Sequence, residues 1–314
     1  MTDDLAAARA RLTRSAAFAS ITMALLLAGL KIWAVLKTDS TAMLGSLADT
    51  GLDFIASVAT LVGVWVAAQP ADREHRFGHG KAEALAAMFQ VVLISLSAFG
   101  LAFRSVEQFL GGHRVAGASE GILVSLIAIA GTFLLLWWQR HVIRQTGSVA
   151  IKTDNVHYKS DLFLNLGVIA ALALDHYLGL GGADPLFGLA IALWLGWGGW
   201  RASTEALDHL MDKEWPEEKR EQFVAVLAKH PELKGVHDLR TRTSGAHDFV
   251  QFHAMVNGDM TVAEAHTVMD ELEERIEREF PGVEVLIHPD PEGLVNETGS
   301  AAQELLPGLA ESHE

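Results

Sequence analysis

Long apolar runs occupy the first two thirds of this chain, whereas its last third mixes acidic, basic and apolar positions. A helix needs about 20 apolar residues to cross a bilayer, and six runs approach or exceed that length. They cover approximately Ser15 to Leu36, Thr41 to Ala67, Ala82 to Leu110, Gly121 to Trp138, Val149 to Leu178 and Pro185 to Ala206. The pattern predicts a domain of six transmembrane helices over residues 1–210.

The last third has the periodicities of a small soluble α/β domain over residues 211–290. Two alternating stretches flank a turn at Ser244-Gly245-Ala246, and Thr261-Val-Ala-Glu264 has the form of a helix capping box. The predicted order is helix, strand, strand, helix, strand, at residues 216–230, 235–243, 248–257, 261–280 and 283–288. Residues 291–314 carry Glu but no Lys or Arg, so we expect a disordered acidic tail.

Basic residues gather at alternate ends of the apolar runs. The loops at the opposite ends carry little more than Lys37 and Arg114. By the positive-inside rule, both termini and the soluble domain are expected in the cytoplasm. The basic residues concerned are Arg9, Arg11, Arg14, Arg73, Arg76, Lys81, Arg140, Arg144, Lys152, Arg201 and Lys213.

Composition limits the partners and the kinds of metal ligand that this chain can use. The formal net charge of −15 argues against nucleic acid as a partner. The chain contains no cysteine, which excludes disulfides and thiolate metal sites. Any bound metal must therefore accept nitrogen and oxygen ligands, and the 14 histidines supply an unusual number of nitrogen donors.

Two pairs of polar ligands interrupt the apolar runs at a spacing of four residues. Asp49 and Asp53 lie in the second run, and His157 and Asp161 in the fifth. Each pair shares one helix face, and each carboxylate costs about 2.5–3.5 kcal/mol at mid-membrane, so a compensating ligand is expected. Three carboxylates and one imidazole suit a divalent cation for which protons compete, which is the basis of an antiporter. The alternative is a water-filled vestibule, or pairing with an intramembrane base such as Lys31 or Lys159.

A second candidate site lies in the loop after the second run. Asp72, His75 and His79 offer three ligands within eight residues, and Gly78 and Gly80 allow a tight backbone there. These residues are suited to weak metal binding. The alternative is a solvated loop whose basic residues only set the topology.

The soluble domain offers a third set of ligands on several predicted elements. These ligands can form one site only if the fold brings their elements together. The alternative is that the histidines are scattered over the surface. Asp290 follows His288 at the end of the last strand, where its carboxylate could bridge two ions. The set comprises His237, His253, His266, His288 and Asp290.

These motifs together resemble the cation diffusion facilitator family, most closely its bacterial zinc and ferrous-iron efflux branch. The likeness covers roughly residues 12–290 and rests on Asp49-x-x-x-Asp53, His157-x-x-x-Asp161, the His75-to-Glu83 loop and the α/β domain. It implies a ferredoxin-like, metallochaperone-like cytoplasmic domain and a homodimer with six helices per subunit. It also implies exchange of a cytoplasmic divalent cation for protons by alternating access.

The resemblance assigns roles to individual residues. The two membrane pairs match the transport site, and Asp72, His75 and His79 match a loop site. The five soluble-domain ligands match a binuclear site at the cytoplasmic dimer interface, and Lys81 and Asp212 match a charge interlock near the junction of the domains.

We therefore expect a multi-pass inner-membrane Zn²⁺/H⁺ antiporter that exports metal from the bacterial cytoplasm, with Fe²⁺ or Cd²⁺ as alternative cargo. A metal-responsive sensor or scaffold, or a metal channel, is the alternative class. An enzyme is not expected, because catalytic zinc keeps an open position beside a substrate pocket and no such pocket is indicated.

Overall fold

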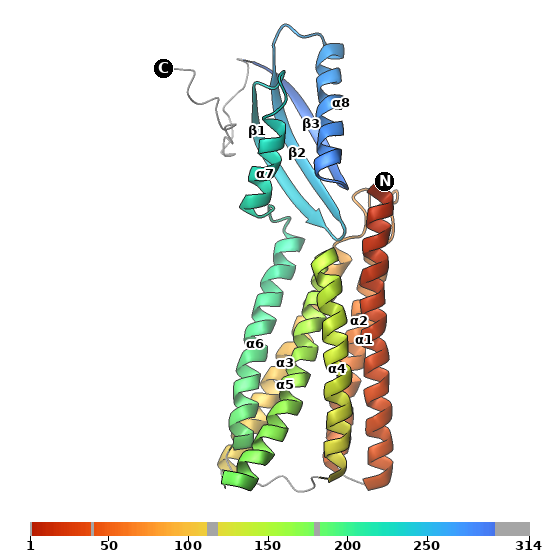
Figure 1. Cartoon of the computed structure of the whole chain (residues 1–314), viewed down its shortest axis with the longest axis vertical. Coiled ribbons are helices and arrows are strands. Elements are labelled where there is room, and N and C mark those ends of the chain that lie inside the picture. The colour runs from red at the N-terminus through yellow and green to blue at the C-terminus, as the bar shows by residue number, and fades with distance from the viewer. Residues whose placement is uncertain (1, 39–40, 112–118, 179–182, 293–314) are drawn as a thin grey trace. The chain divides into compact units, whose positions relative to one another are not determined.

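The computed structural model describes residues 2–38, 41–111, 119–178 and 183–292, and it divides into two compact units (Figure 1). One unit comprises Arg9–Leu210, and the other begins at Met211 and includes Met1–Ala8. The acidic tail expected to be disordered lies, from residue 293 on, outside the described residues.

Six long helices make up the first unit within the described residues. Their bounds are α1 Thr2–Thr38, α2 Thr41–Ala67, α3 Ala82–Gly111, α4 Ser119–Thr146, α5 Val149–Leu178 and α6 Ala183–Leu210. The second, third and fifth agree closely with the apolar runs. Helices α1 and α4 extend further, because hydropathy marks the stretch suited to lipid rather than the ends of the helix.

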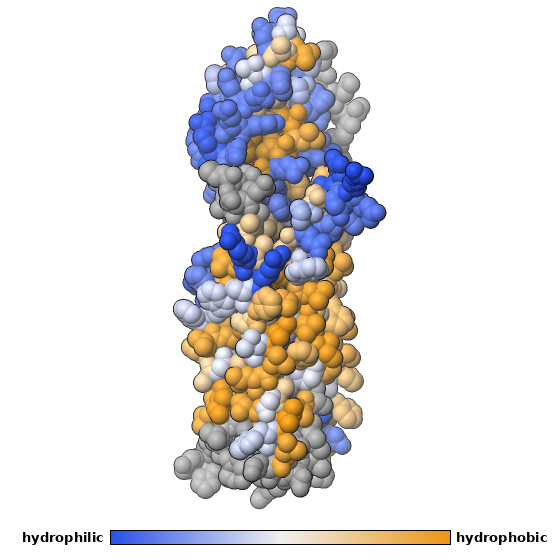
Figure 2. Space-filling model, turned by 90° about the vertical axis from the view of Figure 1, so that its right-hand side faces the viewer, coloured by the Kyte–Doolittle hydropathy of each residue, from blue (hydrophilic) through white to orange (hydrophobic). Residues whose placement is uncertain are grey.

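The surface of this unit has the character of a membrane domain. Large apolar side chains such as Phe99, Phe103 and Leu193 remain exposed, and apolar residues cover much of the face of the helices that Figure 2 shows. In the described residues, four helices meet a span criterion of length and composition, within Ala7–Trp33, Thr50–Ala67, Ala82–Leu110 and Leu126–Thr146. The described residues of helices α5 and α6 fall outside that criterion.

Close helix contacts depend on small residues. A Cβ built on Gly63 in α2 would lie 2.3 Å from the Cβ of Ala86 in α3. The two backbones therefore approach more closely than larger side chains would allow, as is common between transmembrane helices.

The second unit is a two-layer α/β domain with the predicted αββαβ order. Its elements are α7 Glu217–Leu227, β1 Gly235–Ser244, β2 His247–Val256, α8 Val262–Glu279 and β3 Val283–Pro291. Strand β2 is central, antiparallel to β1 and parallel to β3. The capping box of α8 is confirmed, since Thr261 accepts from the backbone of Glu264 and the Glu264 side chain accepts from the backbone of Thr261.

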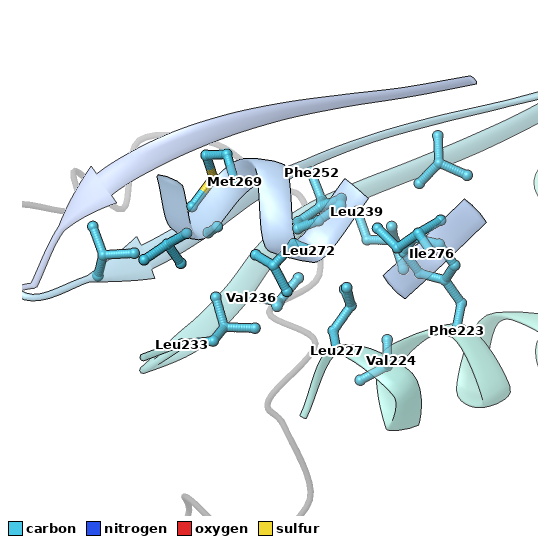
Figure 3. Packing of buried hydrophobic residues seen from close by; sticks show 14 of the residues in the cluster. Phe223, Val224, Leu227, Leu233, Val236, Leu239, Phe252, Met269, Leu272 and Ile276 are labelled. Atoms are coloured by element: carbon cyan, nitrogen blue, oxygen red, sulfur yellow. The ribbon is translucent and has the colours of Figure 1, made fainter. Parts of the chain in front are cut away.

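Both helices of this unit pack on one face of the sheet. Phe223 and Leu227 from α7 and Leu272 and Ile276 from α8 meet Phe252 of β2 in a buried apolar core (Figure 3). Successive strand residues point to opposite faces. The neighbours of the core positions therefore project from the sheet face that the helices leave uncovered.

Candidate metal sites

The membrane unit brings three predicted ligands together across two helices. The Nε2 atom of His157 on α5 lies 2.8 Å from Oδ1 of Asp53 on α2 and 3.9 Å from Oδ2 of Asp161. One ligand atom from each residue lies within 4.8 Å of the others. Asp49 is also on α2, one turn before Asp53, but its side chain lies outside the described part of the structure.

This cluster is poorly accessible to water. The His157 side chain is only 6% exposed, and its Nδ1 atom is buried without a hydrogen-bond partner in the described structure. The other ring nitrogen, Nε2, is the one that faces both carboxylates. An imidazole nitrogen beside two carboxylate oxygens is a donor set that suits a divalent cation.

The loop residues also converge. The carboxylate of Asp72 lies 3.3 Å from Nδ1 of His75 and 3.4 Å from Nε2 of His79. Backbone hydrogen bonds hold the loop, chiefly from the N–H of His75 and also from that of Glu74, and they lower the pKa of Asp72 below its usual value. Asp72 is thus kept ionised, although it and His75 are about half exposed.

The cytoplasmic unit places three histidines in a row across its three strands. His253 on β2 is paired in register with His237 on β1 and with His288 on β3. Their rings are tilted to one another by 47° and 51°, at centroid distances of 4.9 and 4.7 Å. The row exists because the register of both strand pairs places these three positions side by side, on the sheet face opposite Phe252.

Asp290 contacts all three histidines of this row. One of its oxygens, Oδ2, is 2.7 Å from Nδ1 of His253 and 3.2 Å from Nε2 of His237, and Oδ1 is 3.1 Å from Nε2 of His288. A carboxylate with an oxygen toward each side can bridge two cations.

Three other predicted residues are not joined to these clusters. His266 on α8 is 75% exposed and lies 3.8 Å from Asp270, apart from the histidine row. Lys81 donates to the backbone carbonyl of Leu210, and Asp212 lies 3.7 Å from Arg242. The interlock between Lys81 and Asp212, which belong to different units, stays a prediction.

A polar network that the sequence did not predict lies close to the membrane cluster. Asp154, three residues before His157 on α5, is fully buried and accepts hydrogen bonds from three other helices. A carboxylate inside an apolar run was the available signal. It was missed because two of its donors, Gln90 and Ser20, lie 64 and 134 residues away in sequence.

Comparison with known proteins identifies the family. The family model described as the cation efflux transmembrane domain matches residues 17–211, and that of the cation efflux protein cytoplasmic domain matches residues 215–292. The chain belongs to the cation efflux family. This is the cation diffusion facilitator family indicated by the motifs.

The family assignment agrees with curated relatives that match over nearly their whole length. The cation-efflux pump FieF of Klebsiella pneumoniae is 39% identical over 285 residues, which cover 91% of this chain and 95% of the pump. FieF of Serratia proteamaculans is 39% identical over 296 residues, which cover 94% and 98% of the two chains. These relatives are efflux pumps and not enzymes, so this chain is a cation efflux protein of the membrane.

Among solved structures, the zinc form of CzrB is 41% identical to this chain, covering 27% of this chain and 99% of the CzrB chain, with a TM-score of 0.26.

Proposed function

We propose that this protein is a Zn²⁺/H⁺ antiporter that exports zinc from the bacterial cytoplasm. The observation that carries the proposal is the position of His157 Nε2 between the carboxylates of Asp53 and Asp161. With Asp49 one turn away on α2, these residues supply four ligands, as tetrahedral Zn²⁺ requires. The relatives named cation-efflux pumps support export as the direction of transport.

Proton coupling follows from the chemistry of the ligands. Zn²⁺ binds a neutral imidazole and ionised carboxylates, so protons and metal compete for the same atoms. In the inward-open state the cation enters and displaces any bound protons. When the helices rock and the site opens outward, protons that reach His157 and one carboxylate weaken the ligands and release the metal.

The choice of metal rests on the donor atoms. One nitrogen and three oxygens suit both Zn²⁺ and Fe²⁺, and Cd²⁺ is a further candidate. We favour Zn²⁺ because a four-ligand site of imidazole and carboxylates matches its tetrahedral preference.

We assign the cytoplasmic unit to dimerisation and metal sensing. The histidine row lies on the sheet face that its own helices leave uncovered, where a second subunit can pack. Metal held by His237, His253, His288 and Asp290 would tighten the homodimer, and His266 is a further ligand supplied across the interface. The loop site binds metal more weakly because it is exposed, and Lys81 and Asp212 join the two units in the transport-competent state.

We place the protein in the inner membrane with both termini in the cytoplasm, on the distribution of basic residues. In this orientation the soluble unit is exposed to the cytoplasmic metal that is to be exported.

The proposal is tested by Zn²⁺ flux in proteoliposomes, with and without a pH gradient, for the wild type and for His157→Ala. We expect flux that follows the gradient and is lost in the variant. Flux indifferent to pH indicates a channel, and zinc binding without flux indicates a sensor or scaffold. If Fe²⁺ or Cd²⁺ moves well and Zn²⁺ poorly, the exchange mechanism stands and the assigned cargo is wrong.

A further inference from the structure

One buried carboxyl joins four helices of the membrane unit. The Oδ1 atom of Asp154 on α5 accepts from Nε2 of Gln90 on α3 at 2.8 Å. Its Oδ2 atom accepts from Nε2 of Gln139 on α4 at 2.7 Å and from Oγ of Ser20 on α1 at 2.6 Å. All four side chains are essentially inaccessible to solvent.

Further hydrogen bonds extend this network to α2. The Oε1 atom of Gln139 accepts from Nδ2 of Asn155 at 2.9 Å. The hydroxyl of Tyr158 donates to the backbone carbonyl of Ser20 at 2.9 Å and lies 3.0 Å from Oγ of Ser57 on α2. Helices α1 to α5 therefore all contribute to one buried polar network.

The network shares two turns of α5 with the metal ligands. Along α5 the order is Asp154, Asn155, His157, Tyr158, Asp161, so network residues and ligands interleave. On α2, Ser57 of the network lies one turn after Asp53. Because a helix rotates as a unit, the rotation that would loosen Asp154 from its donors would also move His157 away from the carboxylate of Asp53.

The chemistry of the network is that of a support rather than of a metal site. Every side chain that donates to Asp154 is a neutral amide or hydroxyl, and no Lys, Arg or His forms an ion pair with it among the described residues. Asp154 also lies outside the group of Asp53, His157 and Asp161 that brings ligand atoms together. Any effect on the metal must therefore act through the placement of α5.

We propose that Asp154 is a positioning residue: its hydrogen bonds to Ser20, Gln90 and Gln139 fix α5 so that His157 and Asp161 face Asp53 in metal-binding geometry. The inference rests on the proposed transport function of those three ligands. Its essential element is the set of hydrogen bonds, and not the negative charge.

Two substitutions at one position separate hydrogen bonding from charge. Asp154→Asn keeps the size of the side chain, and its carbonyl can still accept from Gln139 and Ser20. Its amide can donate to Gln90 once that side chain turns over, because Oε1 of Gln90 is buried without a partner in the described structure. Asp154→Leu keeps the branch at Cγ in a larger side chain and makes none of these bonds. Thr153→Val is the matched control, since Thr153 is equally buried but bonds only to the carbonyl of Val149 in its own helix.

The measurement is Zn²⁺ flux at limiting zinc in proteoliposomes, over a range of pH, with the full chain. We expect Asp154→Leu to lower flux by about 10–100-fold, the usual effect of losing a group that orients a metal ligand. Asp154→Asn should restore flux to within about threefold and keep the pH profile of the wild type, and Thr153→Val should match the wild type. If Asp154→Leu does not fold, Gln139→Leu replaces it, with a loss expected at the lower end of the same range.

Three results would overturn the proposal: wild-type flux in the folded leucine variant, equal loss in Asp154→Asn and Asp154→Leu, or a shifted pH profile in Asp154→Asn. The last two would make the charge or a proton of Asp154 the essential element. Asp53→Ala is measured in the same assay. If that variant transports normally, the proposed transport site fails, whereas an inactive Asp53→Ala beside a fully active Asp154→Leu defeats only the positioning role.

Discussion

The Nε2 atom of His157 lies 2.8 Å from Oδ1 of Asp53, although 104 residues separate them in the chain. This contact joins α5 to α2 and unites two ligand pairs that the sequence presents separately. Without a cation, the imidazole bridges carboxylates that would otherwise repel each other. These three side chains already lie close together, so binding a cation would require only small side-chain rotations.

Removing a carboxylate from this cluster should stop transport without disrupting the fold. Asp161→Ala eliminates a ligand that lies 3.9 Å from the imidazole, and we expect metal flux to fall by more than about 100-fold, exceeding the loss typical of a supporting residue. Proteoliposome flux measures transport, and gel filtration measures whether the dimer is intact. Asp259→Asn, which removes an exposed carboxylate between β2 and α8, is the control, and near-normal flux in Asp161→Ala would show that the site is wrongly assigned.

The cytoplasmic histidine row should lose its metal when its carboxylate is replaced. Asp290 contacts all three histidines, so Asp290→Ala should abolish zinc binding by this unit and weaken the dimer at low protein concentration. Equilibrium dialysis and analytical ultracentrifugation measure both effects. His247→Ala serves as the control because this exposed histidine on β2 lies outside the row. Unchanged zinc stoichiometry in Asp290→Ala would contradict the assignment.

The close approach of α2 and α3 should be sensitive to one methyl group. In Gly63→Ala the new Cβ would lie 2.3 Å from that of Ala86, so the helices must separate. We expect the free energy of unfolding to fall by about 1–3 kcal/mol. Thermal unfolding in detergent provides the measurement. Gly51→Ala on the same helix has no atom within 4 Å of the new Cβ and should not destabilise the protein; equal losses in both variants would refute the packing argument.

The capping box of α8 should make part of the cytoplasmic unit's stability depend on pH. The backbone and side-chain hydrogen bonds of Thr261 lower the pKa of Glu264 from its ordinary value of 4.5. The stabilisation is therefore complete above pH 4.5 and is lost as the pH falls through the lower folded-state pKa. Urea unfolding of residues 211–292 at several pH values should show this loss of stability at low pH. Glu264→Gln should make the free energy of unfolding depend less on pH.

Loss of the cap itself gives a second measure of the same feature. Thr261→Ala should cost about 1 kcal/mol at neutral pH. If the free energy of unfolding of Glu264→Gln depends on pH as in the wild type, the loss of stability in acid arises from other groups of this unit.

The sequence predicted the membrane helices well, because lipid allows few structures other than helices and the apolar runs mark them directly. The start of α1 at Thr2 was not predicted, since the charged residues before Ser15 continue the helix beyond the apolar stretch. The hairpin turn and the cap of α8 follow from local residue types, and both were predicted.

What the sequence did not predict depends on contacts between distant residues. The parallel pairing of β2 with β3, which puts His288 beside His253, is a choice of topology that alternation alone does not make. The β1 irregularity at Asp238, with φ of 51°, has no marker such as glycine. The donors to Asp154 depend on how each helix is rotated about its axis, which hydropathy does not determine.

The position of β3 also governs when the cytoplasmic cluster can form during synthesis. The β1–β2 hairpin is synthesised before β3 and carries the register pair His237 and His253, but it lacks Asp290, the carboxylate that contacts all three histidines. That group arrives with β3, the last strand of the described chain, after the whole of α8 has been made. A chain truncated before residue 283 would lose both His288 and Asp290, so the proposed cytoplasmic metal site can form only in a subunit that has been synthesised through β3.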